Sequence, residues 1–306
     1  MPGGCCLHAF SVLWRREQIW YNDGVIILYP LGKCDNQKRR IKRDHKEKIM
    51  RILFIRHGDP DYEHDSLTEK GVREAQLLAD RMVKEDIRDF YVSPLGRARK
   101  TGSYTLERLG RAAQVKDWLQ EFPAEVDIGG SEFLQKAFPD TEKEGSGYRK
   151  RISWDMLPGC WGDKPEYFDR YAWRNTEVAA HSRMNQAYDA MAAGLDELLA
   201  QYGYFRDGSW YHTEQGNNDT IVCFCHFGII CAMLSYLWNV SPFILWHSLA
   251  LAPTSVTEVF TEEREKGTVI FRATKLGDIS HLYAGSEPPS FSCRFCQVYE
   301  NEDERH

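Results

Sequence analysis

The sequence lacks the pattern of a membrane-spanning segment, the pattern of a signal peptide and the net positive charge of a general nucleic-acid-binding protein. The most apolar stretch, residues 221–238, contains His226, Gly228 and Ser235, so it is a poor candidate for a membrane span. No basic segment leads through an apolar run to a small-residue cleavage site, which argues against a signal peptide. The formal net charge of −6 argues against general nucleic-acid binding. We therefore expect a soluble protein with neither a membrane nor a nucleic-acid partner.

An ordered cysteine framework is also absent. The nine cysteines show no regular spacing, which is typical of a reducing compartment and predicts a cytoplasmic protein. Cys293 and Cys296 form a lone C-x-x-C pair, and the adjacent Cys5 and Cys6 lack the spacing of a second zinc-binding pair. We expect no metal ion and no cofactor.

The first 49 residues differ from the rest of the chain. They are rich in Lys and Arg, whereas the remainder is acidic, and they show no helical or strand periodicity. We expect residues 1–49 to be a non-native or disordered leader, with Met50 opening the folded domain of residues 50–306. A basic arm that binds an acidic partner is the alternative.

The folded part begins with an apolar segment that is followed directly by an arginine and a histidine. Residues 51–55 are typical of a buried strand, and Arg56-His57-Gly58 follows them directly. Arginine donates in a planar fork that fits phosphate oxygens, and histidine serves as a nucleophile or acid/base near neutral pH. Because ligands of open α/β sheets bind at the carboxyl ends of strands, this segment predicts an anion site.

Two further strand ends carry matching residues. Residues 89–92 read as a strand, and Ser93-Pro94 predicts the cap and first position of a helix that brings Arg97 to the strand end. Arg99 falls on another side of that helix, and we expect it on the surface. Residues 220–225 form a third apolar strand that ends at His226. Two arginines and two histidines at converging strand ends predict a phosphate site with a nucleophile.

With these motifs in place, the chain resembles the histidine phosphatase superfamily, which includes the cofactor-dependent phosphoglycerate mutases. The matching motifs, in family order, are Arg56-His57-Gly58, Ser66-Leu67-Thr68-Glu69-Lys70-Gly71, Ser93-Pro94-Leu95-Gly96-Arg97-Ala98 and His226-Phe227-Gly228. The resemblance implies a phosphoglycerate mutase-like fold, a three-layer α/β/α sandwich with a mostly parallel central sheet. It also implies a metal-independent phosphomonoester hydrolase acting on a small phosphorylated metabolite.

The resemblance further implies a role for each site residue. His57 is the nucleophile that becomes phosphohistidine. Arg56, Arg97 and His226 hold the phosphoryl oxygens, and Phe227 belongs to the same phosphate-binding set. The family's proton donor follows a short third strand, often in a Leu-x-Glu context, which here is Leu119-Gln120-Glu121. Glu121 is thus the candidate donor, with Glu125 as the alternative.

The chain departs from the mutase pattern at two of these motifs. The usual Thr-x-x-Asn run after the first motif is replaced by Asp59-Pro60-Asp61-Tyr62-Glu63, and Phe227 separates His226 from Gly228. These changes favour a phosphatase over a mutase. A phosphoglycerate-type mutase and a non-catalytic phosphate-binding module are the alternatives. The substrate and the oligomeric state, including a homodimer, stay open.

Secondary structure outside the motifs is less regular. A capping-box pattern at residues 66–69 predicts a helix from Thr68 to about Lys84, and a long helix is expected over residues 176–202. Residues 122–175 are rich in Gly, Pro and Trp, and we expect them to form an insertion that caps the site and sets specificity, or a simple surface insertion. Residues 255–260 and 268–273 predict a hairpin at one sheet edge.

Overall fold

The computed structural model describes residues 48–138, 141, 143–145, 147–292 and 300, and two short strands ahead of them. The chain divides into two compact units, Met1–Lys46 and Glu47–His306. In the first unit, β1 (Tyr21–Asn22) pairs with β2 (Val25–Ile26). Most of the expected leader, residues 1–49, lies outside the described residues, so that prediction stays untested. The Cys5-Cys6 pair and the Cys293-x-x-Cys296 pair also lie outside them.

The second unit is built on a mixed eight-stranded sheet with the order β12-β13-β16-β15-β3-β14-β6-β7. Its parallel half consists of β3 (Arg51–Arg56), β14 (Thr220–Cys225), β6 (Asp89–Val92) and β7 (Gln114–Val115). The antiparallel half consists of β15 (Val256–Glu265), β16 (Thr268–Asp278), β13 (Trp210–His212) and β12 (Phe205–Asp207). The predicted α/β fold class is confirmed, with parallel pairing at the centre of the sheet.

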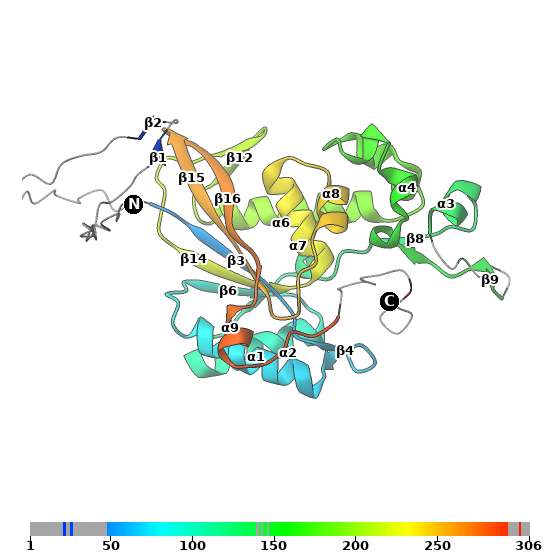
Figure 1. The fold of residues 1–306 in the computed structure, drawn as a ribbon. Helices are drawn as coiled ribbons and strands as arrows, with labels where there is room; N and C mark the ends of the chain where they lie inside the picture. The colour runs from blue at the N-terminus through cyan, green and yellow to red at the C-terminus, as the bar shows by residue number, and fades with distance from the viewer. Residues whose placement is uncertain are drawn as a thin grey trace, which may run out of the picture. The chain divides into compact units, whose positions relative to one another are not determined.

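Helices cover both faces of the parallel half (Figure 1). On one face, α1 (Glu69–Met82) and α2 (Gly96–Leu109) pack over Leu53 and Ile55. On the other face, α6 (Met184–Ala200), α7 (Phe227–Trp238) and α8 (Pro242–Ser248) pack over Ile52 and Phe54. Successive β3 side chains thus enter two different cores, as the period of two in a strand requires. The result is the predicted three-layer arrangement.

Residues 122–175 form an irregular insertion of short elements to one side of the sheet (Figure 1). Its elements are β8 (Glu125–Val126), α3 (Glu132–Ala137), β9 (Lys143–Glu144), β10 (Gly147–Tyr148), β11 (Arg151–Ile152), η2 (Ser153–Asp155), α4 (Pro158–Trp161), η3 (Pro165–Tyr167) and η4 (Ala172–Asn175). The remaining short elements are β4 (Pro60–Asp61), β5 (Ser66–Leu67), η1 (Asp117–Leu119), α5 (Glu177–Ala180) and α9 (Ser280–Ala284). The expected capping role of the insertion stays a prediction.

Four local expectations were wrong. The cap of α1 is Thr68, whose hydroxyl accepts from the Gly71 N–H at 3.0 Å, rather than Ser66. The helix after β6 begins at Gly96 with Leu95 as its N-cap, because the Ser93 hydroxyl accepts from the Leu95 N–H and turns the chain before the helix starts.

The expected long helix is split into α5 and α6, and an isolated bridge between Val126 and Ser182 occupies the break. The β15–β16 hairpin is not at a sheet edge, since β15 pairs with β3 and β13 pairs with β16.

Among the described residues, no helix has both the length and the apolar character needed to cross a bilayer.

A buried carboxyl on α1 makes the stability of the fold depend on pH. Glu74 is fully buried, and burial raises its pKa to about 7, although N–H groups of Asp59 and Ser290 donate to it. The charge of Asp59 raises this pKa further, while Lys70 opposes the shift. A folded-state pKa above the usual value means that Glu74 favours folding at low pH and loses that contribution as pH rises through about 7.

We therefore expect the free energy of unfolding of the wild type, relative to Glu74→Gln, to fall by about 3 kcal/mol between pH 4.5 and 8. Urea denaturation at a series of pH values measures this difference. Glu69→Gln, at an exposed position of the same helix, is the control. Parallel pH profiles for wild type and Glu74→Gln would contradict the assignment.

Candidate active site

Three adjacent parallel strands bring the predicted residues to one place. β14 lies between β3 and β6, with Cys225 opposite Arg56 and Phe224 opposite Val92. The chain leaves each strand at the same level, because the His57 N–H donates to Cys225 O at 3.0 Å and the Ser93 N–H donates to Phe224 O at 2.9 Å. His57, Ser93 and His226 therefore lie side by side at the carboxyl edge of the sheet.

His57 is held with one ring nitrogen engaged. The ring is 2% exposed, and its Nδ1 lies 2.7 Å from the Gly58 carbonyl oxygen. A carbonyl only accepts, so Nδ1 carries the proton and Nε2 carries the lone pair. Burial, followed by the charges of Arg56, His226 and Arg97, holds the pKa of His57 well below its usual value. The ring is thus a neutral base or nucleophile through Nε2.

His226 faces His57, with ring centroids 5.0 Å apart. Its Nε2 lies 2.8 Å from the Ser93 hydroxyl, and its buried Nδ1 has no partner among the described residues. Burial and the charges of Arg97 and Arg56 hold the pKa of His226 well below its usual value. Two neutral imidazoles beside two guanidinium groups form a site that favours a bound anion.

Arg56 is oriented by two backbone carbonyls. The residue is 1% exposed, and its Nη1 donates to Leu251 O at 2.6 Å and to Ser292 O at 3.1 Å. The guanidinium charge of Arg56 acts on His57, since it is one of the charges that lower the pKa of that histidine. The position is consistent with the predicted phosphoryl-binding role, which stays a prediction.

Arg97 is oriented by a carboxylate that the sequence motifs did not single out. Its Nη1 donates to Asp65 Oδ1 at 2.8 Å, and its guanidinium lies 5.5 Å from the Tyr62 ring centre. The buried Nε of Arg97 has no partner among the described residues. The charge of Arg97 reaches both histidines, since it lowers the pKa of His57 and of His226. Arg99 is exposed, as expected.

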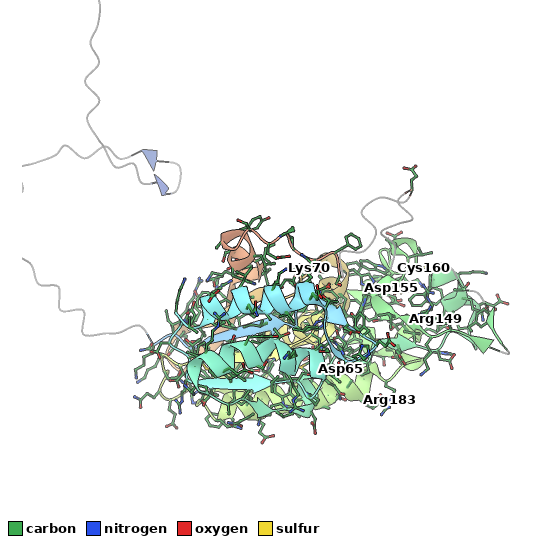
Figure 2. All side chains as sticks on the ribbon, turned by 90° about the horizontal axis from the view of Figure 1, so that it is seen from below. Asp65, Lys70, Arg149, Asp155, Cys160 and Arg183 are labelled. Carbon is green, nitrogen blue, oxygen red and sulfur yellow. The ribbon has the colours of Figure 1, made fainter. Side chains whose placement is uncertain are left out.

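Asp65 also occupies the start of α2. Its carboxylate accepts from the Gly96 N–H at 2.5 Å as well as from Arg97. Burial would raise the pKa of Asp65, but these hydrogen bonds hold it below the usual value. Asp65 is one of four described non-glycine residues with positive φ, at 44°, a strained conformation that its contacts maintain. In Figure 2 it lies on the side of the helical layer that is toward the labelled insertion residues Arg149 and Asp155.

Glu121 reaches the site, and Glu125 does not. The Oε1 atom of Glu121 accepts from the N–H of Phe122 at 2.8 Å and from the N–H of Ile229, in the first turn after His226, at 3.2 Å. Burial raises the pKa of Glu121, although Arg56 and Arg97 oppose the shift. Glu125 is exposed on β8 and pairs with Lys150 at 3.2 Å. The geometry favours Glu121 over Glu125 as the proton donor, a role that stays a prediction.

Gly228 allows the Glu121 carboxyl and the Trp154 ring to approach α7. A Cβ atom at Gly228 would lie 2.7 Å from the Trp154 ring and 2.9 Å from Glu121 Oε1. The Trp154 ring packs edge-on against Phe227, with centroids 5.5 Å apart. Because the Phe227 side chain is apolar and buried, only its backbone could serve the predicted phosphate contact. Sequence patterns did not single out Trp154, since its approach to α7 spans more than 70 residues.

A cavity of about 560 Å³ lies at the insertion, and its lining includes Pro123, Glu125, Asp127, Lys150 and Arg183. Among the described residues, no cluster of His, Cys, Asp or Glu could hold a metal ion.

Comparison with known proteins agrees with the motifs. Residues 52–150 match the family model of the histidine phosphatase superfamily, branch 1. No curated protein sequence matches the chain.

Three solved structures illustrate its similarities. An Entamoeba histolytica phosphoserine phosphatase mutant is 18% identical over 76% of this chain and 99% of its own, with a TM-score of 0.49. A mycobacterial glucosyl-3-phosphoglycerate phosphatase is 17% identical over 75% of this chain and 99% of its own, with a TM-score of 0.46. A Bacillus anthracis phosphoglycerate mutase is 18% identical over 78% of this chain and 98% of its own, with a TM-score of 0.45.

The close approach at Gly228 leads to a stability prediction. We expect Gly228→Ala to lower the free energy of unfolding by about 1–3 kcal/mol, because the new methyl group overpacks Trp154 and Glu121. The helix preference of Ala returns at most about 1 kcal/mol. Gly159→Ala on α4, where a Cβ meets nothing within 4 Å, is the matched control. Chemical denaturation measures both variants, and equal or higher stability of Gly228→Ala would refute the packing described here.

Proposed function

Since this chain belongs to the histidine phosphatase superfamily through residues 52–150, we propose that it is a metal-independent phosphomonoesterase that acts through a phosphohistidine on His57. The observation that carries the proposal is the convergence of His57 with Arg56, Arg97 and His226 at three adjacent strand ends. The substrate is a small phosphorylated metabolite.

The two arginines supply the electrostatic part of the reaction. Phosphoryl transfer needs in-line geometry and cationic stabilisation of the equatorial oxygens more than a strong nucleophile. Arg56 and Arg97 lie close enough to His57 to lower its pKa, so their charges act on the point where the phosphoryl group would sit. The unpartnered Nδ1 of His226 adds a third contact to the phosphoryl oxygens. This contact requires the Nδ1–H tautomer, with the Ser93 hydroxyl donating to Nε2.

The first step forms a bond between His57 Nε2 and phosphorus and breaks the ester P–O bond. Because Nδ1–H is already fixed on the Gly58 carbonyl, Nε2 presents its lone pair to the phosphorus atom. The leaving alkoxide takes the proton of the Glu121 carboxyl. The raised pKa of Glu121 keeps more of this acid protonated near neutral pH than an exposed glutamate would be.

The second step returns the enzyme to its starting state. Glu121, now a carboxylate, takes a proton from water, whose oxygen attacks the phosphorus atom and displaces His57. Phosphate leaves and Glu121 is again protonated.

The first test is phosphate release from a panel of phosphomonoesters with chelator present. We expect wild type to release phosphate and His57→Ala to release none, because the covalent intermediate cannot form. His212→Ala, on the exposed side of β13, is the matched control and should keep full activity. A trapped phosphate on the wild-type protein that is labile in acid and stable in alkali would identify the phosphohistidine intermediate. Equal release by wild type and His57→Ala would sink the proposal.

A second test separates the two candidate acids. We expect Glu121→Gln to slow hydrolysis of alkyl phosphates by ~10²–10⁴-fold, the usual contribution of a positioned general acid. Aryl phosphates, whose leaving groups need little protonation, should slow far less. Glu125→Gln, on the exposed strand β8, should leave both rates near wild type. Steady-state kcat values on one alkyl and one aryl ester test whether Glu121 is the general acid. An equal loss of kcat on both esters in Glu121→Gln would contradict that role.

A further inference from the structure

The chain after α9 runs back across α1 toward the loop that follows His57. We call residues 287–292 the C-terminal strap. Its first residue, Glu287, accepts from Lys70 Nζ at 2.7 Å and from Arg73 Nε at 3.0 Å. Lys70, labelled on α1 in Figure 2, also donates to the Pro288 carbonyl. These contacts fix the start of the strap on the outer side of α1.

The far end of the strap is fixed on Asp59. Both Ser290 and Ser292 donate their hydroxyls to Asp59 Oδ1, the latter at 2.9 Å, and Thr68 donates to Oδ2 at 2.7 Å. The Ser290 N–H donates to Glu74 at 3.1 Å, and Glu74 in turn accepts from the Asp59 N–H at 2.9 Å. In the part of the chain that the structure describes, no Lys or Arg forms an ion pair with Asp59. Hydroxyls therefore satisfy this carboxylate, and two of the three come from the strap.

The strap then touches the phosphate site itself. The Ser292 carbonyl accepts from Arg56 Nη1 at 3.1 Å, next to the contact that the same nitrogen makes with Leu251 O at 2.6 Å. Two carbonyls on one guanidinium nitrogen set both its position and its plane. Because Arg56 is buried, a change in either carbonyl would be transmitted to the group that faces the phosphoryl oxygens.

We propose that Ser290 and Ser292 are positioning residues of the phosphate site, which dock the strap on Asp59 so that the Ser292 carbonyl orients Arg56. The inference rests on the proposed function in that Arg56 binds the phosphoryl group. It also explains a departure in the sequence, since Asp59 begins the run that replaces the family's usual Thr-x-x-Asn pattern. In this loop, Asp59 accepts the hydrogen bonds that hold the C-terminal strap in place.

The test is the double variant Ser290→Ala and Ser292→Ala in the full chain. We expect the Kd for inorganic phosphate, measured by calorimetry, to rise by about tenfold, the usual effect of losing hydrogen bonds to a charged group. KM for a phosphomonoester should rise with it, and kcat should change less. Ser290→Thr with Ser292→Thr keeps both hydroxyls and should restore phosphate affinity. Ser103→Ala is the matched control, because the Ser103 hydroxyl lies on α2 and donates to Lys100 O of the same helix in an exposed hydrogen bond.

The outcomes are separable from those of the proposed function. Phosphate binding can be measured without turnover. A wild type that binds phosphate but hydrolyses no ester would therefore overturn the proposed hydrolase activity, and the effect of the strap on the Kd for phosphate could still be measured. Wild-type phosphate affinity in the double variant would overturn the strap proposal whatever the turnover. A wild type that does not bind phosphate would overturn both. If the double variant does not fold, Ser292→Ala alone should weaken phosphate binding in the same direction, and unchanged affinity there would count against the proposal.

Discussion

The parallel pairing of β14 with both β3 and β6 is the constraint on which the rest of the site depends. These strands are far apart in the chain, and their register alone puts His226 beside His57 and Ser93. A shift of one residue in β14 would turn His226 away from the site, because successive side chains in a strand face opposite sides. The two helical layers hold that register by burying opposite faces of the same strands.

Charge is the second organising factor. Burial, together with the charges of two guanidinium groups, lowers the pKa of both imidazoles, so the site carries positive charge without protonated histidine. Within the described residues, Asp65 is the carboxylate that balances this charge at the start of α2, where it holds Arg97. For Glu121, burial raises the pKa and outweighs the lowering effect of the nearby arginines. One region of the protein thus keeps a histidine neutral and favours a protonated carboxyl.

The sequence predicted the parts of this site that depend on local pattern. The strands that deliver His57 and His226 are continuous apolar runs, each followed by a histidine with a glycine close behind it, which is why their positions could be predicted. The start of α2 could not be, because Ser93 uses its hydroxyl on the Leu95 N–H and on His226 rather than as a helix cap. Contacts such as Asp65 with Arg97 depend on loop conformation and long-range packing, for which a single sequence holds no periodic signal.

The same limit explains the errors in the fold. The hairpin of β15 and β16 was expected at a sheet edge, because the three-residue strands β12 and β13 are too short and too polar to stand out. The break between α5 and α6 arises where Ser182 pairs with Val126, a partner from the insertion. In both cases a distant segment decided the outcome.

The contact between Arg56 and Ser292 joins residues 236 positions apart. Synthesis on the ribosome proceeds from the N-terminus at about 5–20 residues per second. His57 and its strand therefore leave the ribosome more than 200 residues before the Ser292 carbonyl that contacts Arg56. A nascent or prematurely terminated chain would display the Arg-His-Gly loop without this contact, so the geometry around Arg56 reports that synthesis has passed residue 292.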